Sequence, residues 1–196
     1  TTPRMSWILG SGRRGQMQTA YQVLVASSPA ALAKDDGDLW NSGKVMSDQS
    51  VLVPYAGSAL HSGMACYWKV QVWDKDGRQS AWSPTGFWTM GLLSQEEWKG
   101  EWIGKDDGPD TSDDRTLAAR WLRKEFSVTK PIARATVSMA GLGLSELYCN
   151  GEKVSDDVLS PGLSDYTRRV YYVTRDVTAL LRQGANAIGV ILGNGR

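Results

Sequence analysis

Apolar and polar side chains alternate with a period of two residues through much of the first half of the chain. The alternation is clearest over residues 19–26 and 66–73, and turn-forming residues follow both segments at 27–29 and 74–77. Gly77 ends the second of these turns and can adopt a positive φ, which favours a hairpin. Short strands at a spacing of roughly 8–12 residues, without a long helical period, predict an antiparallel β-sandwich.

The second half of the chain is also predicted to be mainly β. Alternating strands are expected at residues 121–128, 133–139 and 170–173. Asn150-Gly151 is a strong signal for a two-residue hairpin turn. Residues 187–192 are apolar on both faces and predict a central buried strand. One short helix is expected over residues 176–184, with a polar residue at its start and Gly184 at its end.

The distribution of charge divides the chain into three segments. Residues 1–93 contain 8 basic and 6 acidic side chains, and residues 120–196 contain 11 and 7. Between them, residues 94–119 contain 3 basic and 8 acidic side chains and are rich in Gly and Asp. This composition predicts an acidic linker or surface loop between two β domains.

Composition excludes several classes of function. The net charge of +1 gives no broad attraction for nucleic acid or an anionic membrane, and no run of 18 apolar residues could span a bilayer. The two cysteines, Cys66 and Cys149, form neither a disulfide framework nor a zinc cage, and we interpret them as buried apolar side chains. The single histidine, His61, is interpreted as a surface side chain.

Two short motifs match ligand-binding signatures in residue type, but each lacks a feature that the binding site needs. Residues 10–15 fit the dinucleotide pattern G-x-G-x-x-G, but an alternating strand follows where a helix is needed, so a flexible loop is favoured. Asp74, Asp76 and Gly77 resemble the start of a calcium-binding EF-hand loop. Thr85 occupies the twelfth position, where that loop needs a bidentate carboxylate, so a hairpin turn is favoured.

An ordered series of longer motifs resembles the N-terminal region of bacterial α-L-rhamnosidases of glycoside hydrolase family 78. In the first half, the similar segments are residues 18–27, 38–43, 53–57 and 67–74, followed by Gly77, Ser80 and Trp82-Ser83. In the second half, they are residues 141–143, 146–148, 150–154, 159–162, 164–166, 168–170, 176–178 and 193–195. Leu163 departs from the family, which usually has an aromatic residue there.

The resemblance implies a fold and a function. The expected architecture is a fibronectin III or immunoglobulin-like β-sandwich over residues 1–93, a linker over 94–119, and part of a jelly-roll β-sandwich over 120–196. The parent protein would hydrolyse terminal α-L-rhamnosyl bonds with inversion. Its catalytic (α/α)₆ barrel would lie beyond Arg196, so we expect residues 1–196 alone to be inactive. The alternative is a β-sandwich adhesion or interaction module without an enzyme.

Partners and stability follow from the same interpretation. The expected partners are the catalytic domain of the same protein and rhamnose-containing glycans. A jelly roll needs about eight strands, and residues 120–196 supply fewer. We therefore expect the second half of an isolated chain to be marginally stable and to self-associate, while the first half stays folded.

Candidate sugar-binding residues lie in the loops of the second half, where polar side chains flank the strand ends. They are Asn150, Asp157, Asp165, Tyr166 and Asn194. Their oxygen and nitrogen atoms could bind sugar hydroxyls, or the oxygens could coordinate calcium; no cofactor is required. No catalytic residue is predicted, because Asp156, Asp157, Asp165 and Asp176 are interpreted mainly as solvated turn residues.

Overall fold

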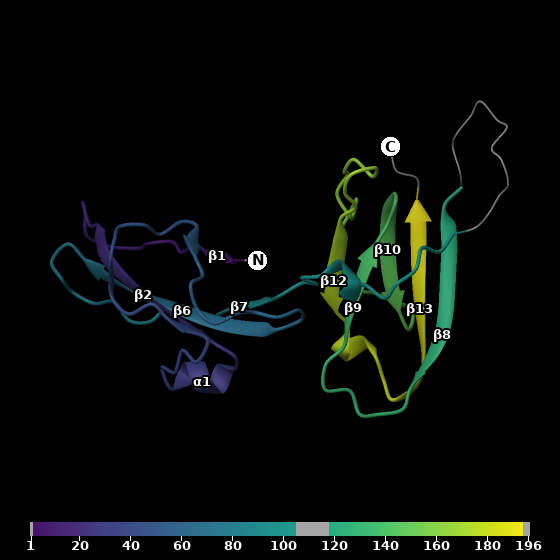
Figure 1. The fold of residues 1–196 in the computed structure, drawn as a ribbon, viewed down its shortest axis with the longest axis horizontal. Helices are drawn as coiled ribbons and strands as arrows, with labels where there is room; N and C mark the ends of the chain where they lie inside the picture. The colour runs from purple at the N-terminus through teal and green to yellow at the C-terminus, as the bar shows by residue number, and fades with distance from the viewer. Residues whose placement is uncertain (1, 105–117, 194–196) are drawn as a thin grey trace. The chain divides into compact units, whose positions relative to one another are not determined.

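The computed structural model describes residues 2–104 and 118–193 and is almost entirely β (Figure 1). The chain divides into two compact units, Thr1–Glu101 and Trp102–Arg196. Half of the predicted acidic linker, residues 105–117, lies outside the described residues. Within the described ranges, no helix has the length and apolar character needed to cross a membrane.

The first unit is an immunoglobulin-like β-sandwich, as predicted. Its larger sheet has the strand order β3-β2-β6-β7, with β4 also pairing with β2, and β1 pairs with β5 in a second, two-stranded sheet. The elements are β1 (Arg4–Met5), β2 (Gln18–Ala26), α1 (Pro29–Ala33), β3 (Trp40–Asn41), β4 (Val45–Met46), β5 (Val53–Pro54), β6 (Ala65–Asp74), β7 (Gly86–Thr89) and the 3₁₀ helix η1 (Gln95–Glu97).

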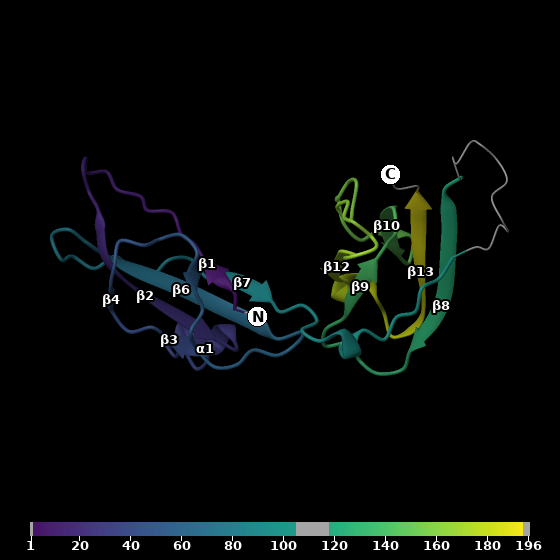
Figure 2. The ribbon, with the colours of Figure 1, turned by 45° about the horizontal axis from the view of Figure 1, so that its top comes forward.

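The two faces of β6 pack against different layers. Cys66 and Val70 belong to the main core with Val23 and Val25 of β2, so the predicted apolar face of residues 66–73 is confirmed. The opposite face carries Lys69, which is buried and donates a hydrogen bond to the carbonyl oxygen of Leu32 in α1. Figure 2 shows α1 beside β2 and β6. The larger sheet therefore has packed side chains on both faces, although α1 covers only part of the second face.

The second unit has two antiparallel sheets of unequal size. One has the order β11-β10-β13-β8, and the other consists of β12 and β9 (Figures 1 and 2). The elements are β8 (Arg120–Val128), β9 (Thr136–Ala140), β10 (Leu144–Cys149), β11 (Glu152–Lys153), β12 (Tyr172–Asp176), the 3₁₀ helix η2 (Thr178–Leu180) and β13 (Gly184–Gly193). This arrangement fits the predicted partial jelly roll.

The expected helix over residues 176–184 is wrong, because only the single turn η2 forms. Asp176 instead pairs with Thr136 at the end of β12, and its carboxylate accepts a hydrogen bond from the backbone N–H of Thr178. Gly184 has a φ of +95° and opens β13 rather than ending a helix. Pairing between strands therefore outweighs the local helical signal.

The other strand predictions hold with changed details. Asn150 and Gly151 have φ values of +52° and +90°, as a two-residue hairpin turn between β10 and β11 requires. The strand predicted at 170–173 begins later, at Tyr172. β13 is central, with β10 and β8 on its two sides, but most of its residues are only half-buried, on both faces of the strand.

The glycine-rich loop, the Asp74–Gly77 turn, the histidine and the two cysteines have the structures that were predicted without a ligand. Residues 10–15 form a loop that leads into β2, and Gly77 has a φ of +76° in the turn after β6. His61 is exposed, whereas Cys66 and Cys149 are buried, and burial raises the pKa of each thiol. None of these residues has the environment of a phosphate, metal or nucleophilic site.

Candidate carbohydrate-binding surfaces

Asn150, the first predicted sugar ligand, has its side chain engaged within the fold. Its Nδ2 donates to the carbonyl oxygen of Leu180 at 2.8 Å and to Oδ1 of Asn186 at 2.9 Å. Its Oδ1 accepts from the backbone N–H of Ala187 at 2.9 Å. Asn186 is 4% exposed and bonds in turn to Arg182. The two amides therefore tie the β10–β11 turn to the start of β13.

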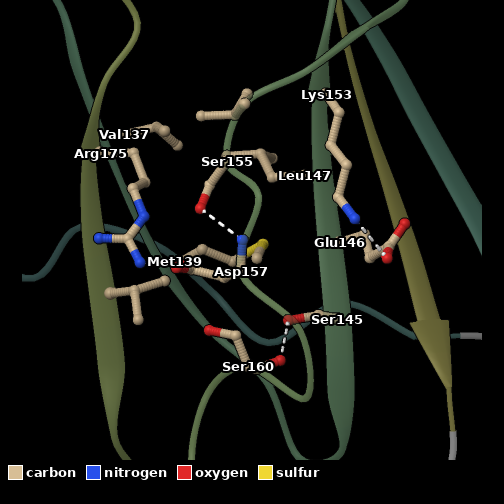
Figure 3. Close-up of a pocket in the computed structure, with 12 residues that line it drawn as sticks. Val137, Met139, Ser145, Glu146, Leu147, Lys153, Ser155, Asp157, Ser160 and Arg175 are labelled. Atoms are coloured by element: carbon tan, nitrogen blue, oxygen red, sulfur yellow. Dashed lines mark hydrogen bonds and ion pairs between the residues drawn. The ribbon is translucent and has the colours of Figure 1, made fainter.

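Asp157, the second predicted ligand, is paired with Arg175 of β12. The carboxylate accepts a hydrogen bond from the guanidinium, and the Asp157 backbone N–H donates to Oγ of Ser155 at 3.0 Å. Figure 3 shows the two charged side chains reaching toward each other at a pocket between the sheets. The ion pair anchors the loop after β11 to the smaller sheet.

This pocket is too small for a sugar. Its volume is about 30 Å³, whereas small-molecule sites usually measure roughly 300–1,000 Å³. Its walls include the apolar side chains Val137, Met139 and Leu147, and Ser145 donates to the carbonyl oxygen of Ser160 at its rim (Figure 3). The pocket is thus a packing gap under the loop, with room for little more than water.

The remaining predicted ligands do not join Asn150. Asp165 accepts hydrogen bonds from the N–H and the hydroxyl of Thr167 and is exposed, and Tyr166 follows it, half-buried. This loop lies near the end of β10 at which Ser145 bonds to Ser160, whereas Asn150 follows the other end of that strand. Asn194 lies outside the described residues. The predicted residues therefore do not form one cluster in the described structure.

Calcium coordination stays a prediction. In residues 2–104 and 118–193, no three His, Cys, Asp or Glu side chains are grouped closely enough to hold a metal ion. Asp176 is occupied locally, because the hydroxyl and the N–H of Thr178 donate to it and lower its pKa.

Sequence reasoning missed a second surface, on the outward face of the four-stranded sheet. Trp121 of β8 is 81% exposed there, and Tyr148 of β10 lies on the same face. The Tyr148 hydroxyl donates to Glu146 at 2.9 Å, and Lys153 donates to the same carboxylate at 2.6 Å. The alternation of residues 121–128 had placed Trp121 opposite the core-facing side chains, but no sequence signal connected it to Tyr148.

The charges on this face are fixed by the same contacts. Hydrogen bonds from Lys153 and then from Tyr148 lower the pKa of Glu146. The bond to Glu146 raises the pKa of Tyr148, so the phenol stays protonated and donates. Arg123 and Glu125 form a second ion pair at 2.7 Å. Two ion pairs and a phenol therefore share this face of the sheet with an exposed indole.

A groove of about 570 Å³ lies in the first unit, beside the loop of residues 10–15. Arg13 at its edge pairs with Asp76 at 2.9 Å, and Gln16 donates to Asp74 at 2.8 Å. These contacts tie the glycine-rich loop to the turn after β6. The charged and polar side chains at the groove are therefore explained by contacts within the fold, without a ligand.

An immunoglobulin-like sandwich followed by a second, two-sheet sandwich defines a multi-module β-protein whose exposed surfaces are sheet faces and loops. Comparison with known proteins finds a matching family for each sandwich. Residues 1–94 match the family described as Rha78A-like, N-terminal immunoglobulin domain, and residues 130–196 match the α-L-rhamnosidase N-terminal domain. The chain therefore contains, in that order, matches to two N-terminal domains of α-L-rhamnosidases.

Individual relatives agree with this assignment. An α-L-rhamnosidase from Formosa agariphila is 39% identical over 99% of this chain and 22% of its own length. The structure of an α-L-rhamnosidase from Dictyoglumus thermophilum is 41% identical, with a TM-score of 0.88, over 100% of this chain and 23% of that one. The enzyme from Aspergillus terreus is 35% identical, with a TM-score of 0.84, over 100% and 22%. The chain thus spans about a fifth of the length of these relatives.

Proposed function

We propose that this chain is the non-catalytic front part of an enzyme that hydrolyses terminal α-L-rhamnosyl bonds with inversion. The ordered match of both N-terminal domains, with coverage of about a fifth of each relative, carries the proposal. In this role the two sandwiches brace the catalytic domain and hold rhamnose-containing glycan close to it.

The state of the carboxylates supports a role outside catalysis. An inverting glycosidase needs one carboxyl held protonated as general acid and a second as base. Glu146 and Asp176 have lowered pKa values because donors surround them, which suits an ionised partner in a hydrogen bond rather than an acid. The negative charge of Asp157 is balanced by an ion pair with Arg175. These contacts stabilise loops and strands.

The test compares residues 1–196 with the product of the complete coding sequence. We expect the complete product to hydrolyse an aryl α-L-rhamnoside and to release the inverted anomer, which ¹H NMR identifies, and residues 1–196 to show no turnover. Turnover by residues 1–196 that one Asp substitution abolishes would refute the non-catalytic role. A complete product without activity on any α-L-rhamnoside would support the interaction module instead.

A further inference from the structure

The outward face of the four-stranded sheet in the second unit contains a furrow along its central strand. Ala185, Ala187 and Gly189 of β13 point to this face, because alternate residues of a strand share a face. The neighbouring strands place larger side chains on both sides, since Gly189 pairs with Tyr148 of β10 and with Arg123 of β8. The small residues therefore form a floor between two higher walls.

Two adjoining hollows occupy the furrow. One, of about 410 Å³, lies over Gly189 and is lined by Trp121 and Tyr148. The other, of about 440 Å³, lies over Ala185 and is lined by Glu125 and Arg182. Arg123 and Ala187 line both hollows, so the two lie next to each other. Each is within the range of roughly 300–1,000 Å³ that is usual for small-molecule sites.

The walls combine an aromatic surface with fixed polar groups. Trp121 exposes 81% of its surface in the part of the chain that the structure describes. The Tyr148 ring is held by the hydrogen bond of its hydroxyl to Glu146, which Lys153 also contacts. A pyranose ring has the complementary surface: a C–H-rich face that packs on an aromatic ring, and a rim of hydroxyls that bond to charged groups.

We propose that this furrow binds a short run of pyranosyl residues, with one ring stacked on Trp121 over Gly189 and the next directed toward Arg123 and Arg182. Of the loop residues predicted from the sequence, Asn150 lines the second hollow, whereas Asp157, Asp165 and Tyr166 line neither. The proposal rests on the proposed function for the choice of an α-L-rhamnosyl ligand, whose methyl group suits the apolar floor beside Ile191. A protein partner is disfavoured, because the ion pair Arg123–Glu125 lines the furrow and would need desolvation.

Two substitutions test the furrow without damaging the fold. Gly189→Val fills the first hollow, and its Cβ would meet the Leu122 carbonyl oxygen at 3.8 Å and the Tyr148 Cβ at 3.9 Å, which are ordinary contacts. Valine also suits a strand. Trp121→Ala removes the exposed ring. Tyr171→Ala is the matched control, because Tyr171 is an exposed aromatic residue of the same unit outside the furrow.

The experiment is an NMR titration of residues 1–196 with methyl α-L-rhamnopyranoside and, in parallel, methyl β-D-glucopyranoside. We expect saturable shifts of the Trp121 indole N–H and the Gly189 amide with the rhamnoside. Binding should weaken about tenfold in Trp121→Ala and be lost in Gly189→Val, but persist in Tyr171→Ala.

Three outcomes would overturn the proposal: no saturable shift with either glycoside, shifts confined to the loop of residues 156–166, or unchanged binding by Gly189→Val. Binding of the glucoside alone would retain the furrow but refute its rhamnosyl ligand. Hydrolysis by the complete coding product is measured separately, so loss of the furrow proposal would leave the proposed enzyme role intact.

Discussion

Removal of the Asn150 amide should loosen the second unit. In Asn150→Gly the backbone keeps the freedom that its φ of +52° requires, while three side-chain hydrogen bonds disappear. Each is worth about 1 kcal/mol net, and partial exposure of Asn150 reduces the sum. With the added entropy cost of glycine, the expected loss is about 2 kcal/mol, or roughly 10 °C in the Tm of a unit of this size.

The assay is urea unfolding of the second unit together with amide hydrogen exchange at Ala187, whose N–H loses its acceptor. Asp156→Gly is the control for the general cost of glycine at an exposed position of the same unit. We expect faster exchange at Ala187 in Asn150→Gly alone. An unaltered unfolding midpoint together with lost sugar binding would refute the structural assignment and restore Asn150 as a ligand.

Two further predictions concern the first unit. Lys69→Met should destabilise it by about 2 kcal/mol in urea unfolding, because the ammonium donates to the carbonyl oxygen of Leu32 at 2.6 Å and to Asp35 beyond α1; an unchanged midpoint would contradict this. Ser62→Ala should raise the pKa of Glu97, because the hydrogen bond from the Ser62 hydroxyl is the largest cause that lowers this pKa. Because the folded pKa lies below the unfolded one, this carboxylate's stabilisation is full above the unfolded pKa and is lost as pH falls through the folded pKa. A ¹³C NMR titration that gives the same Glu97 pKa in both chains would exclude the effect.

Much of the fold follows from local patterns. The alternation in residues 66–73 predicts both faces of β6, because the side-chain period of a strand fixes which residues face the core. The Asn150-Gly151 pair predicts its turn, because both residues tolerate a positive φ. The helix expected at 176–184 fails for the complementary reason. Its local signal is weak, and the pairing of Asp176 with Thr136, 40 positions earlier in the chain, determines the structure there.

The assignment of site residues was harder, because an asparagine at a strand end has the same sequence signature whether its amide binds a sugar or the protein. For Asn150 the deciding partner is Asn186, 36 residues later. That residue is a buried amide just before an apolar run, and it was the available clue, because a buried polar side chain needs a hydrogen-bonding partner. The sequence supplied both amides but not their proximity.

The furrow, too, could not be predicted from the sequence alone. The alternation in residues 121–128 directs Trp121 away from the core, and the sequence shows Gly189 inside an apolar strand. Neither fact predicts a binding surface until β13 pairs with β8 in the register that sets Gly189 beside Arg123 and Ile191 beside Trp121. A shift of one residue would reverse the faces of β13 and replace the glycine floor with Ile188 and Val190. The proposed sugar site is therefore a property of strand register, which depends on pairing between residues about 65 positions apart.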